Sequence, residues 1–150
     1  MEIDVMAYLS SLEKQLFAQN NRKKISLNKD WPKSLNLNVP GVYVFFENNN
    51  PCYVGETGSL SKRMNDIRNT KHHSLRRSFG TNHFKENVNW SKPSSYVSFH
   101  PEIESELNFL IEKSLQVSLL PVELGRKELE EHICSKYNLL DKYNNRGQRK

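Results

Sequence analysis

Two tyrosine triplets and an arginine are the residues of this sequence whose types and spacing best suit chemistry. The triplets Gly41–Tyr43 and Tyr53–Gly55 place their tyrosines ten residues apart, and Arg63 follows ten residues later. A phenol can orient or deprotonate a water molecule, and a guanidinium can bind phosphate oxygens through paired N–H groups. Together they favour attack of water on a phosphate, which needs positive charge nearby. For either tyrosine alone, an ordinary buried strand position is the commoner explanation.

A divalent cation at such a site needs at least one carboxylate, and Glu130 is the best candidate. Leu129 and Ile133 mark the inward face of the last predicted helix. Glu130 lies about 100° around the helix from Leu129, at the edge of that face. The alternative is that Glu130 is a solvated helix charge paired with Arg126, four residues earlier.

The densest basic stretch is residues 72–77, which begins with two histidines and ends with two arginines. One histidine could act as a second general base or a phosphate ligand, but His72 and His73 cannot both face inward on one helix. The alternative is a solvated basic helix that touches the DNA backbone. Arginines here predict salt-sensitive, sequence-independent phosphate contacts. The candidate nucleic-acid-binding residues are Lys62, Arg68, Arg76 and Arg77.

The hydrophobic pattern predicts the elements that position these side chains. Val42–Phe46 and Cys52–Gly55 are expected to be the strands of a hairpin, and Ser59 to cap the helix that carries Arg63. Apolar spacing also predicts an amphipathic helix over 3–19. The other predicted elements are a polar linker at 20–40, helices at 71–79 (closed by Gly80), 102–113 and 126–137, and strands at 96–99 and 115–122. This order predicts an α+β fold with a small mixed sheet flanked by helices.

The composition predicts one folded basic domain with an anionic partner. The chain has 150 residues, of which 36% are hydrophobic, and a formal charge of +5 that favours nucleic acid as a partner. Cys52 and Cys134 are too few for a disulfide framework or a zinc site, so both are expected to be buried thiols. No apolar run approaches the roughly 20 residues that span a membrane. The acidic start lacks a secretion signal, so we expect a cytoplasmic protein.

The two triplets, Arg63 and the Leu-Glu pair at 129–130 together resemble the signature of the GIY-YIG nuclease superfamily. Valine replaces isoleucine in both triplets, a mild change on a buried strand. The resemblance covers roughly residues 40–144. It implies an endonuclease that cuts DNA with one Mg²⁺ or Mn²⁺ ion. It also implies a three-stranded, mainly antiparallel sheet flanked by helices, here with an extra N-terminal helix.

The resemblance assigns a role to each matching residue. Tyr43 matches the tyrosine that activates the attacking water, and Tyr53 matches the second tyrosine, which positions water and phosphate. Arg63 matches the arginine that stabilises charge on the scissile phosphate, and Glu130 matches the single acidic metal ligand. Further candidates for the site are His73 (in place of a family side chain one helical turn after the arginine), Gly55 of the second triplet, and Asn144 or Asn138 as the family's asparagine.

The expected organisation is a single domain, with an N-terminal helix and linker at 1–38 and the nuclease-like part at 39–150. The N-terminal helix is expected to pack on the core, although it or the stretch at 68–104 could form a homodimer contact. Two other functions remain open from the sequence. One is a non-catalytic or partner-dependent nucleic-acid-binding module on the same scaffold. The other is a small basic interaction protein that assembles through its N-terminal helix.

Overall fold

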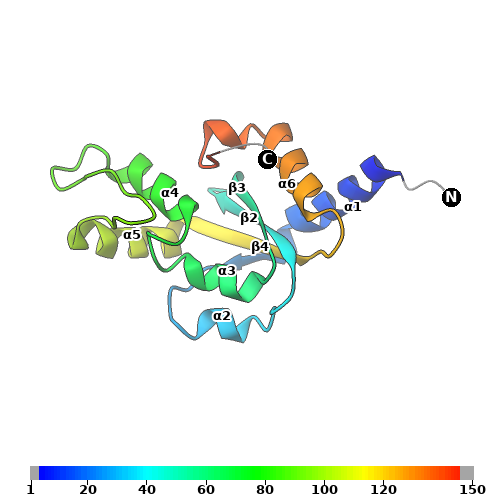
Figure 1. Ribbon diagram of the computed structural model, residues 1–150, viewed down its shortest axis with the longest axis horizontal. Helices are drawn as coiled ribbons and strands as arrows, with labels where there is room; N and C mark the ends of the chain where they lie inside the picture. Colours follow the sequence, from blue (N-terminus) through cyan, green and yellow to red (C-terminus); the bar gives the residue numbers. More distant parts are fainter. Residues whose placement is uncertain (1–3, 146–150) are drawn as a thin grey trace.

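The structure is a computed structural model that describes residues 4–145 of the chain. Within that range, four antiparallel strands form one sheet in the order β1-β4-β2-β3 (Figure 1). The strands are β1 (Arg22–Lys24), β2 (Gly41–Glu47), β3 (Asn50–Thr57) and β4 (Leu115–Pro121). The helices are α1 (Val5–Phe17), α2 (Trp31–Ser34), α3 (Leu60–Asp66), α4 (Ser74–Phe84), α5 (Pro101–Ser114) and α6 (Arg126–Lys136), with short 3-10 turns at η1 (Gln19–Asn21) and η2 (Leu139–Asp141). The predicted α+β class is confirmed, but the sheet has a fourth strand.

The β2–β3 hairpin forms as predicted. Glu47 pairs with Asn50, so Asn48 and Asn49 alone make the turn. Both asparagines have positive φ, 52° and 69°, which is the left-handed backbone that a tight two-residue hairpin turn needs. Asparagine adopts this conformation more readily than most residues, because its short polar side chain bonds locally to the backbone. The turn therefore fixes the register that places the two tyrosines.

Helices cover both faces of the sheet, so all of β2 except its last residue is buried. On one face Tyr43 and Phe45 join a core made with α3, α4 and α5. On the other face Val42, Val44 and Phe46 pack with α1 and α6. In Figure 1, α3 and α6 accordingly lie on opposite sides of the sheet. The unbroken apolar run of β2 is what a strand buried on both faces requires.

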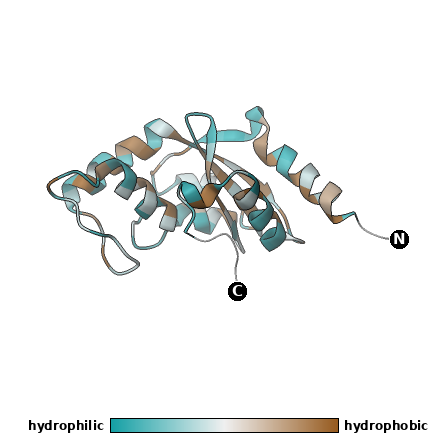
Figure 2. Ribbon diagram, turned by 90° about the horizontal axis from the view of Figure 1, so that it is seen from above, coloured by the Kyte–Doolittle hydropathy of each residue, from teal (hydrophilic) through white to brown (hydrophobic). Residues whose placement is uncertain are grey.

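The predicted N-terminal helix is confirmed as α1, and it packs on its own domain. Leu9 and Leu16 enter the core beside α6, and Figure 2 shows hydrophobic and hydrophilic residues alternating along α1. Glu13 is only 7% exposed, and both oxygens of its carboxylate form hydrogen bonds with side chains of α6 and its C-cap. Its partners are His132, Lys136 and Tyr137. The inner face of α1 is thus used within the chain, and Val5 and Met6 are its large exposed apolar residues.

The prediction of a polar linker at 20–40 is wrong in part, because this segment contains β1 and α2. Arg22–Lys24 pairs with residues 116–118 of β4 as a short edge strand. Charged side chains suit an edge strand, since they stay solvated and discourage pairing with other chains. The segment lacks the apolar alternation by which strands are predicted, and its pairing is decided by β4, far along the chain.

Two further predictions, around the ends of α4 and α5, are wrong. Gly80 lies inside α4, which begins at Ser74 and not at residue 71, so the glycine does not close the helix. A Cβ on Gly80 would lie 2.6 Å from the ring of Phe99, so close packing explains the glycine. The segment Tyr96–Phe99 forms no strand: Phe99 is buried beside α4, whereas Tyr96 is 86% exposed.

The longest helices within residues 4–145 are α5, with 14 residues, and α1, with 13. In the part of the chain that the structure describes, no helix has the length and apolar character needed to cross a bilayer. Cys52 and Cys134 are buried free thiols, as predicted.

Candidate active site

The position of the Tyr43 ring depends on Gly55, its direct partner on β3. A Cβ at Gly55 would lie 2.9 Å from ring carbon Cε1 of Tyr43 and closer still to the hydroxyl. The ring therefore crosses the strand where the glycine has no side chain. Tyr43 is 1% exposed, but it still lines a cavity at the outer edge of the sheet. Any larger residue at position 55 would displace the phenol from this cavity.

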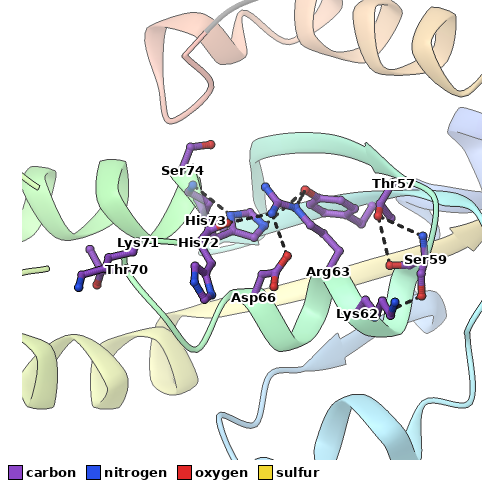
Figure 3. Close-up of polar contacts among 12 residues, drawn as sticks. Thr57, Ser59, Lys62, Arg63, Asp66, Thr70, Lys71, His72, His73 and Ser74 are labelled. Carbon is purple, nitrogen blue, oxygen red and sulfur yellow. Dashed lines mark hydrogen bonds and ion pairs between the residues drawn. The ribbon is translucent and has the colours of Figure 1, made fainter. Parts of the chain in front are cut away.

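Arg63 reaches the hydroxyl of Tyr43 from α3. Its Nε donates to Tyr43 Oη at 3.1 Å, while its Nη1 donates to Asp66 at 3.1 Å and to the His72 carbonyl at 2.9 Å. Figure 3 shows the Arg63 side chain pointing from α3 toward His73, with Asp66 beside it. One side of the guanidinium is thus fixed by the protein, and the side chain remains 25% exposed. This arrangement can present the guanidinium to an anion in the cavity.

His73 lies behind Tyr43 and caps the N-terminus of α4. Its Nδ1 accepts the backbone N–H of Leu75 at 3.2 Å. The proton of the neutral ring must then be on Nε2, which faces Tyr43 Oη at 3.4 Å, the long end of the hydrogen-bonding range. Two donors, from Arg63 and His73, therefore converge on one phenol oxygen. The O–H of Tyr43 must point to another acceptor, such as a water or phosphate oxygen in the cavity.

The protonation states follow from burial and from neighbouring charges. Burial, together with the cations Arg63 and Arg77, lowers the pKa of His73 well below 6.5, so the ring is neutral. Burial is also the main cause that raises the pKa of Tyr43, and nearby Tyr53 adds to it. Arg63 opposes this rise by favouring the phenolate. Without a ligand, Tyr43 is thus a neutral phenol whose oxygen already has donors suited to a phenolate.

Tyr53 lies next to Tyr43 on the same face of the hairpin. The two rings are nearly parallel, with an interplanar angle of 20° and centroids 6.3 Å apart. The hydroxyl of Tyr53 shares a 2.8 Å hydrogen bond with Ser74 Oγ, at the start of α4. Ser74 is a site residue that the sequence did not indicate, because an isolated serine after a histidine has no distinctive pattern.

Glu130 faces the cavity from α6, on the opposite side of the sheet from α3. Its Oε2 accepts the backbone N–H of Glu56 at 3.0 Å. The side chain of Glu56 in turn forms an ion pair with Arg126 at 3.1 Å. These contacts tie α6 to β3 at the rim of the cavity. The charge of Glu130 is near enough to contribute to the raised pKa of Tyr43.

One cavity of about 700 Å³ joins the predicted catalytic groups. Its lining includes Tyr43, Tyr53, Arg63, Arg77, Glu130 and Asn144. Across residues 4–145, no three His, Cys, Asp or Glu side chains gather as a metal-binding group. A cation held by one carboxylate, with water and phosphate oxygens completing its shell, nevertheless fits Glu130 and the space beside it. The donor set of the cavity is therefore compatible with Mg²⁺ or Mn²⁺.

The predicted phosphate contact by Arg76 is wrong, because this side chain is 1% exposed and structural. Its guanidinium donates to Glu104 at 2.7 Å, to Asn108 at 2.6 Å and to the Ile67 carbonyl at 3.2 Å. Thr70 accepts from its Nε at 2.9 Å. A buried guanidinium is stable only with such partners. Arg76 therefore joins α4 to α5 and cannot reach DNA.

The other predicted nucleic-acid contacts have different positions. Arg77 is half-buried, lines the cavity and is held by the carbonyls of Thr70 and Lys71. Lys62 and Arg68 are exposed on or after α3 and do not line the cavity. Figure 3 shows Lys62 on the side of α3 away from His73. Of the four predicted residues, Arg77 is the one that lines the same cavity as Arg63.

Asn144 supports the cavity from the last described segment. Its side-chain amide accepts from the N–H of Val54 at 3.0 Å and donates to the carbonyl of Val54 at 2.9 Å. An amide side chain thus takes the place of a neighbouring strand along the edge of β3. Asn138, the other candidate, has φ of 54° before η2 and does not line the cavity.

Comparison of the chain with protein-family models, with curated proteins and with solved structures finds no match. The function must therefore be argued from the geometry of the cavity. Two phenols, a guanidinium and a carboxylate predicted from the sequence line it, and a buried histidine stands behind them.

Proposed function

We propose that this chain is a metal-dependent endonuclease of the GIY-YIG type that hydrolyses phosphodiester bonds of DNA. The proposal rests mainly on the convergence of four reactive side chains on one cavity, two from the sheet and one from each helical layer. These side chains are Tyr43, Tyr53, Arg63 and Glu130. The overall charge of +5 supports an anionic substrate.

Two arginines would bind the scissile phosphate. Arg63 and Arg77 both line the cavity, and each has one side of its guanidinium fixed by protein acceptors. Guanidinium groups held in this way lose little freedom when they bind phosphate oxygens. They also supply positive charge where negative charge develops on the phosphate as water attacks.

Tyr43 would orient the attacking water and, once its own proton has passed to solvent in the cavity, would take a proton from that water as the phenolate. The Nε–H of Arg63 and the Nε2–H of His73 both point at the phenol oxygen and would stabilise it as a phenolate. His73 acts here as a positioning residue, because it is completely buried and cannot touch the substrate. Tyr53, fixed by Ser74, would hold the water or a phosphate oxygen from the other side.

Glu130 would hold the divalent cation. When bound, the cation supplies positive charge that favours deprotonated water and offsets the burial that keeps Tyr43 protonated. Glu56 has a defined part in this arrangement, since its backbone N–H fixes one oxygen of Glu130 and its side chain holds Arg126. Because this contact fixes Oε2, it also fixes the orientation of the whole Glu130 carboxylate.

The test is cleavage of supercoiled plasmid with Mg²⁺, with Mn²⁺ and with EDTA, using wild type, Glu130→Gln and Glu128→Gln. Gln at position 130 can still accept the N–H of Glu56, so the fold should be kept. We expect metal-dependent nicking or cutting that falls at least about a hundredfold in Glu130→Gln. Glu128 is exposed on the same helix, and its variant should cut like wild type. Equal cleavage by all three would refute the role of Glu130.

A binding-only module is the second candidate, and the burial of Tyr43 is the observation that favours it. A phenol with a raised pKa is inert unless a bound cation and substrate activate it. This alternative predicts salt-sensitive DNA binding in EDTA and no cleavage in either metal. Binding without cleavage on plasmid, nicked and branched DNA would favour it over the endonuclease.

A further inference from the structure

We propose that a basic groove beside the catalytic cavity binds an unpaired stretch of the DNA strand, with one base stacked on Trp90. The inference rests on the proposed function for the identity of the ligand. It goes beyond that function by naming the substrate class: DNA that has unpaired nucleotides next to the scissile phosphate.

The groove is continuous with the catalytic cavity. It has a volume of about 620 Å³ and is formed by α4, the loop that follows α4, and residues 142–145. Arg77 and Asn145 line both the groove and the catalytic cavity. A strand whose phosphate lies at Arg63 can therefore continue into the groove past Arg77. In Figure 1 the loop between α4 and α5 projects at the end of the molecule opposite α1.

The charge of the groove suits a nucleic-acid backbone. Four cations line it, against the single carboxylate of Glu86: Arg77, Lys85, Lys92 and Lys142. Lys142 donates to the carbonyl of Pro51 at 3.0 Å, whereas Lys85 and Lys92 are exposed on the loop side. Cations that line one groove can bind phosphates of a strand without reading its sequence.

Trp90 indicates that the strand in the groove is unpaired. Its indole lines the groove while also packing against the main core, so the ring is supported from behind. Its Nε1–H is buried and has no acceptor within the described residues. An aromatic ring set among lysines is the usual means of holding single strands, because every base has a face that can stack. In a duplex, both faces of each base are covered by neighbouring bases, so only an unpaired base can use Trp90.

Tryptophan fluorescence gives a direct test, because Trp31 and Trp90 are the two tryptophans of the chain. In Trp31→Phe, Trp90 is the sole reporter, and in Trp90→Phe, Trp31 on α2 is the matched control. We expect a single-stranded oligonucleotide in EDTA to quench Trp90 strongly and Trp31 little. A blunt duplex of the same sequence should quench both tryptophans less than the single strand quenches Trp90. No quenching of Trp90, or equal quenching by duplex, would overturn the inference.

Charge removal provides a second test that does not touch the core. Lys85→Ala/Lys92→Ala removes two groove cations, and Lys23→Ala/Lys24→Ala removes two cations from β1 at the opposite edge of the sheet. The groove variant should bind single strands more weakly, with a salt dependence reduced by about 1.4 in the slope of log K against log salt. Equal slopes for the two variants would refute the groove.

These outcomes are separable from those of the plasmid assay. Cleavage that depends on Glu130 together with an unresponsive Trp90 would keep the endonuclease and remove the groove. Quenching and a reduced salt slope without any cleavage would keep the groove as a binding site and remove the endonuclease.

Discussion

Gly55 lies across the hairpin from Tyr43, and its missing side chain is the space that the phenol ring occupies. The spacing of the two triplets therefore has a steric meaning. It places a glycine of β3 directly against the tyrosine of β2, so the hydroxyl can pass over the strand toward Arg63. The glycine of the second triplet thus belongs to the site although it carries no reactive group.

Gly55→Ala should displace Tyr43 and abolish cleavage. The added methyl would overlap the phenol, and overpacking of this kind costs about 1–3 kcal/mol of stability. The matched control is Gly58→Ala, because a Cβ at Gly58 meets nothing within 4 Å. Plasmid cleavage and thermal unfolding of both variants check this. Wild-type cleavage by Gly55→Ala would show that the ring position does not matter.

Tyr43→Phe should reduce cleavage by at least about a hundredfold, the usual effect of losing a general base. The change leaves the donors of Arg63 and His73 without their acceptor, so we also expect a stability loss of about 1–3 kcal/mol. Tyr8→Phe is the control: the hydroxyl of Tyr8 bonds only the Leu124 carbonyl among the described residues. The rate measured under single-turnover conditions should be unchanged in that variant.

His73 should make the fold less stable as the pH falls. Its pKa is held well below 6.5 in the folded chain, whereas the unfolded chain titrates near 6.5. Below that pH the unfolded chain binds a proton that the folded chain does not, so the free energy of unfolding decreases. The loss is at most about 1.4 kcal/mol per pH unit, and it ends once the pH is below the folded pKa.

Urea unfolding at pH 7, 6 and 5 measures this dependence, with His73→Asn as the comparison. Asn keeps an acceptor for the N–H of Leu75 and so retains the cap of α4, but it does not titrate. The stability of His73→Asn should therefore fall less between pH 7 and 5 than that of wild type. Identical pH dependence in the two proteins would mean that His73 is not held neutral by the fold.

Substitutions of the adjacent residues Arg76 and Arg77 should have different effects, the first on stability and the second on DNA binding. Arg76→Met leaves Glu104 without its buried partner and should cost about 3 kcal/mol of stability, which thermal unfolding would show. Arg77→Met should leave unfolding nearly unchanged but weaken DNA binding and flatten its salt dependence. If instead Arg76→Met kept its stability and lost affinity for DNA, the assignment of Arg76 as structural would be wrong.

Local patterns were enough to predict much of the fold. Apolar spacing identified α1, α5 and α6, and Ser59 caps α3 as expected. The predictions fail where residues far along the chain determine the local structure. β1 has only charged residues and exists because β4 is beside it, whereas residues 96–99 have strand-forming side chains but no strand to pair with. Gly80 resembles a cap in sequence, yet it is set by the ring of Phe99.

The site shows the same division. Tyr43, Tyr53, Arg63 and Glu130 could be chosen from spacing and helical phase, and they do line one cavity. The difference in burial between Arg76 and Arg77 could not be predicted, since it depends on which side of α4 faces Glu104. The contact between Glu56 and Glu130 could not be predicted either, because it joins residues that lie 74 positions apart.

The separation of these contacts along the chain also sets the order in which the cavity can form during synthesis. Val54 meets Asn144 across 90 residues, and Glu56 meets Glu130 across 74. At roughly 5–20 residues per second, a ribosome needs about 4–15 s to proceed from Glu56 to Glu130. For most of that time the hairpin and Arg63 exist without the carboxylate of Glu130. The two tyrosines and Arg63 are therefore synthesised before Glu130, and the cavity that they line together can form only late in translation.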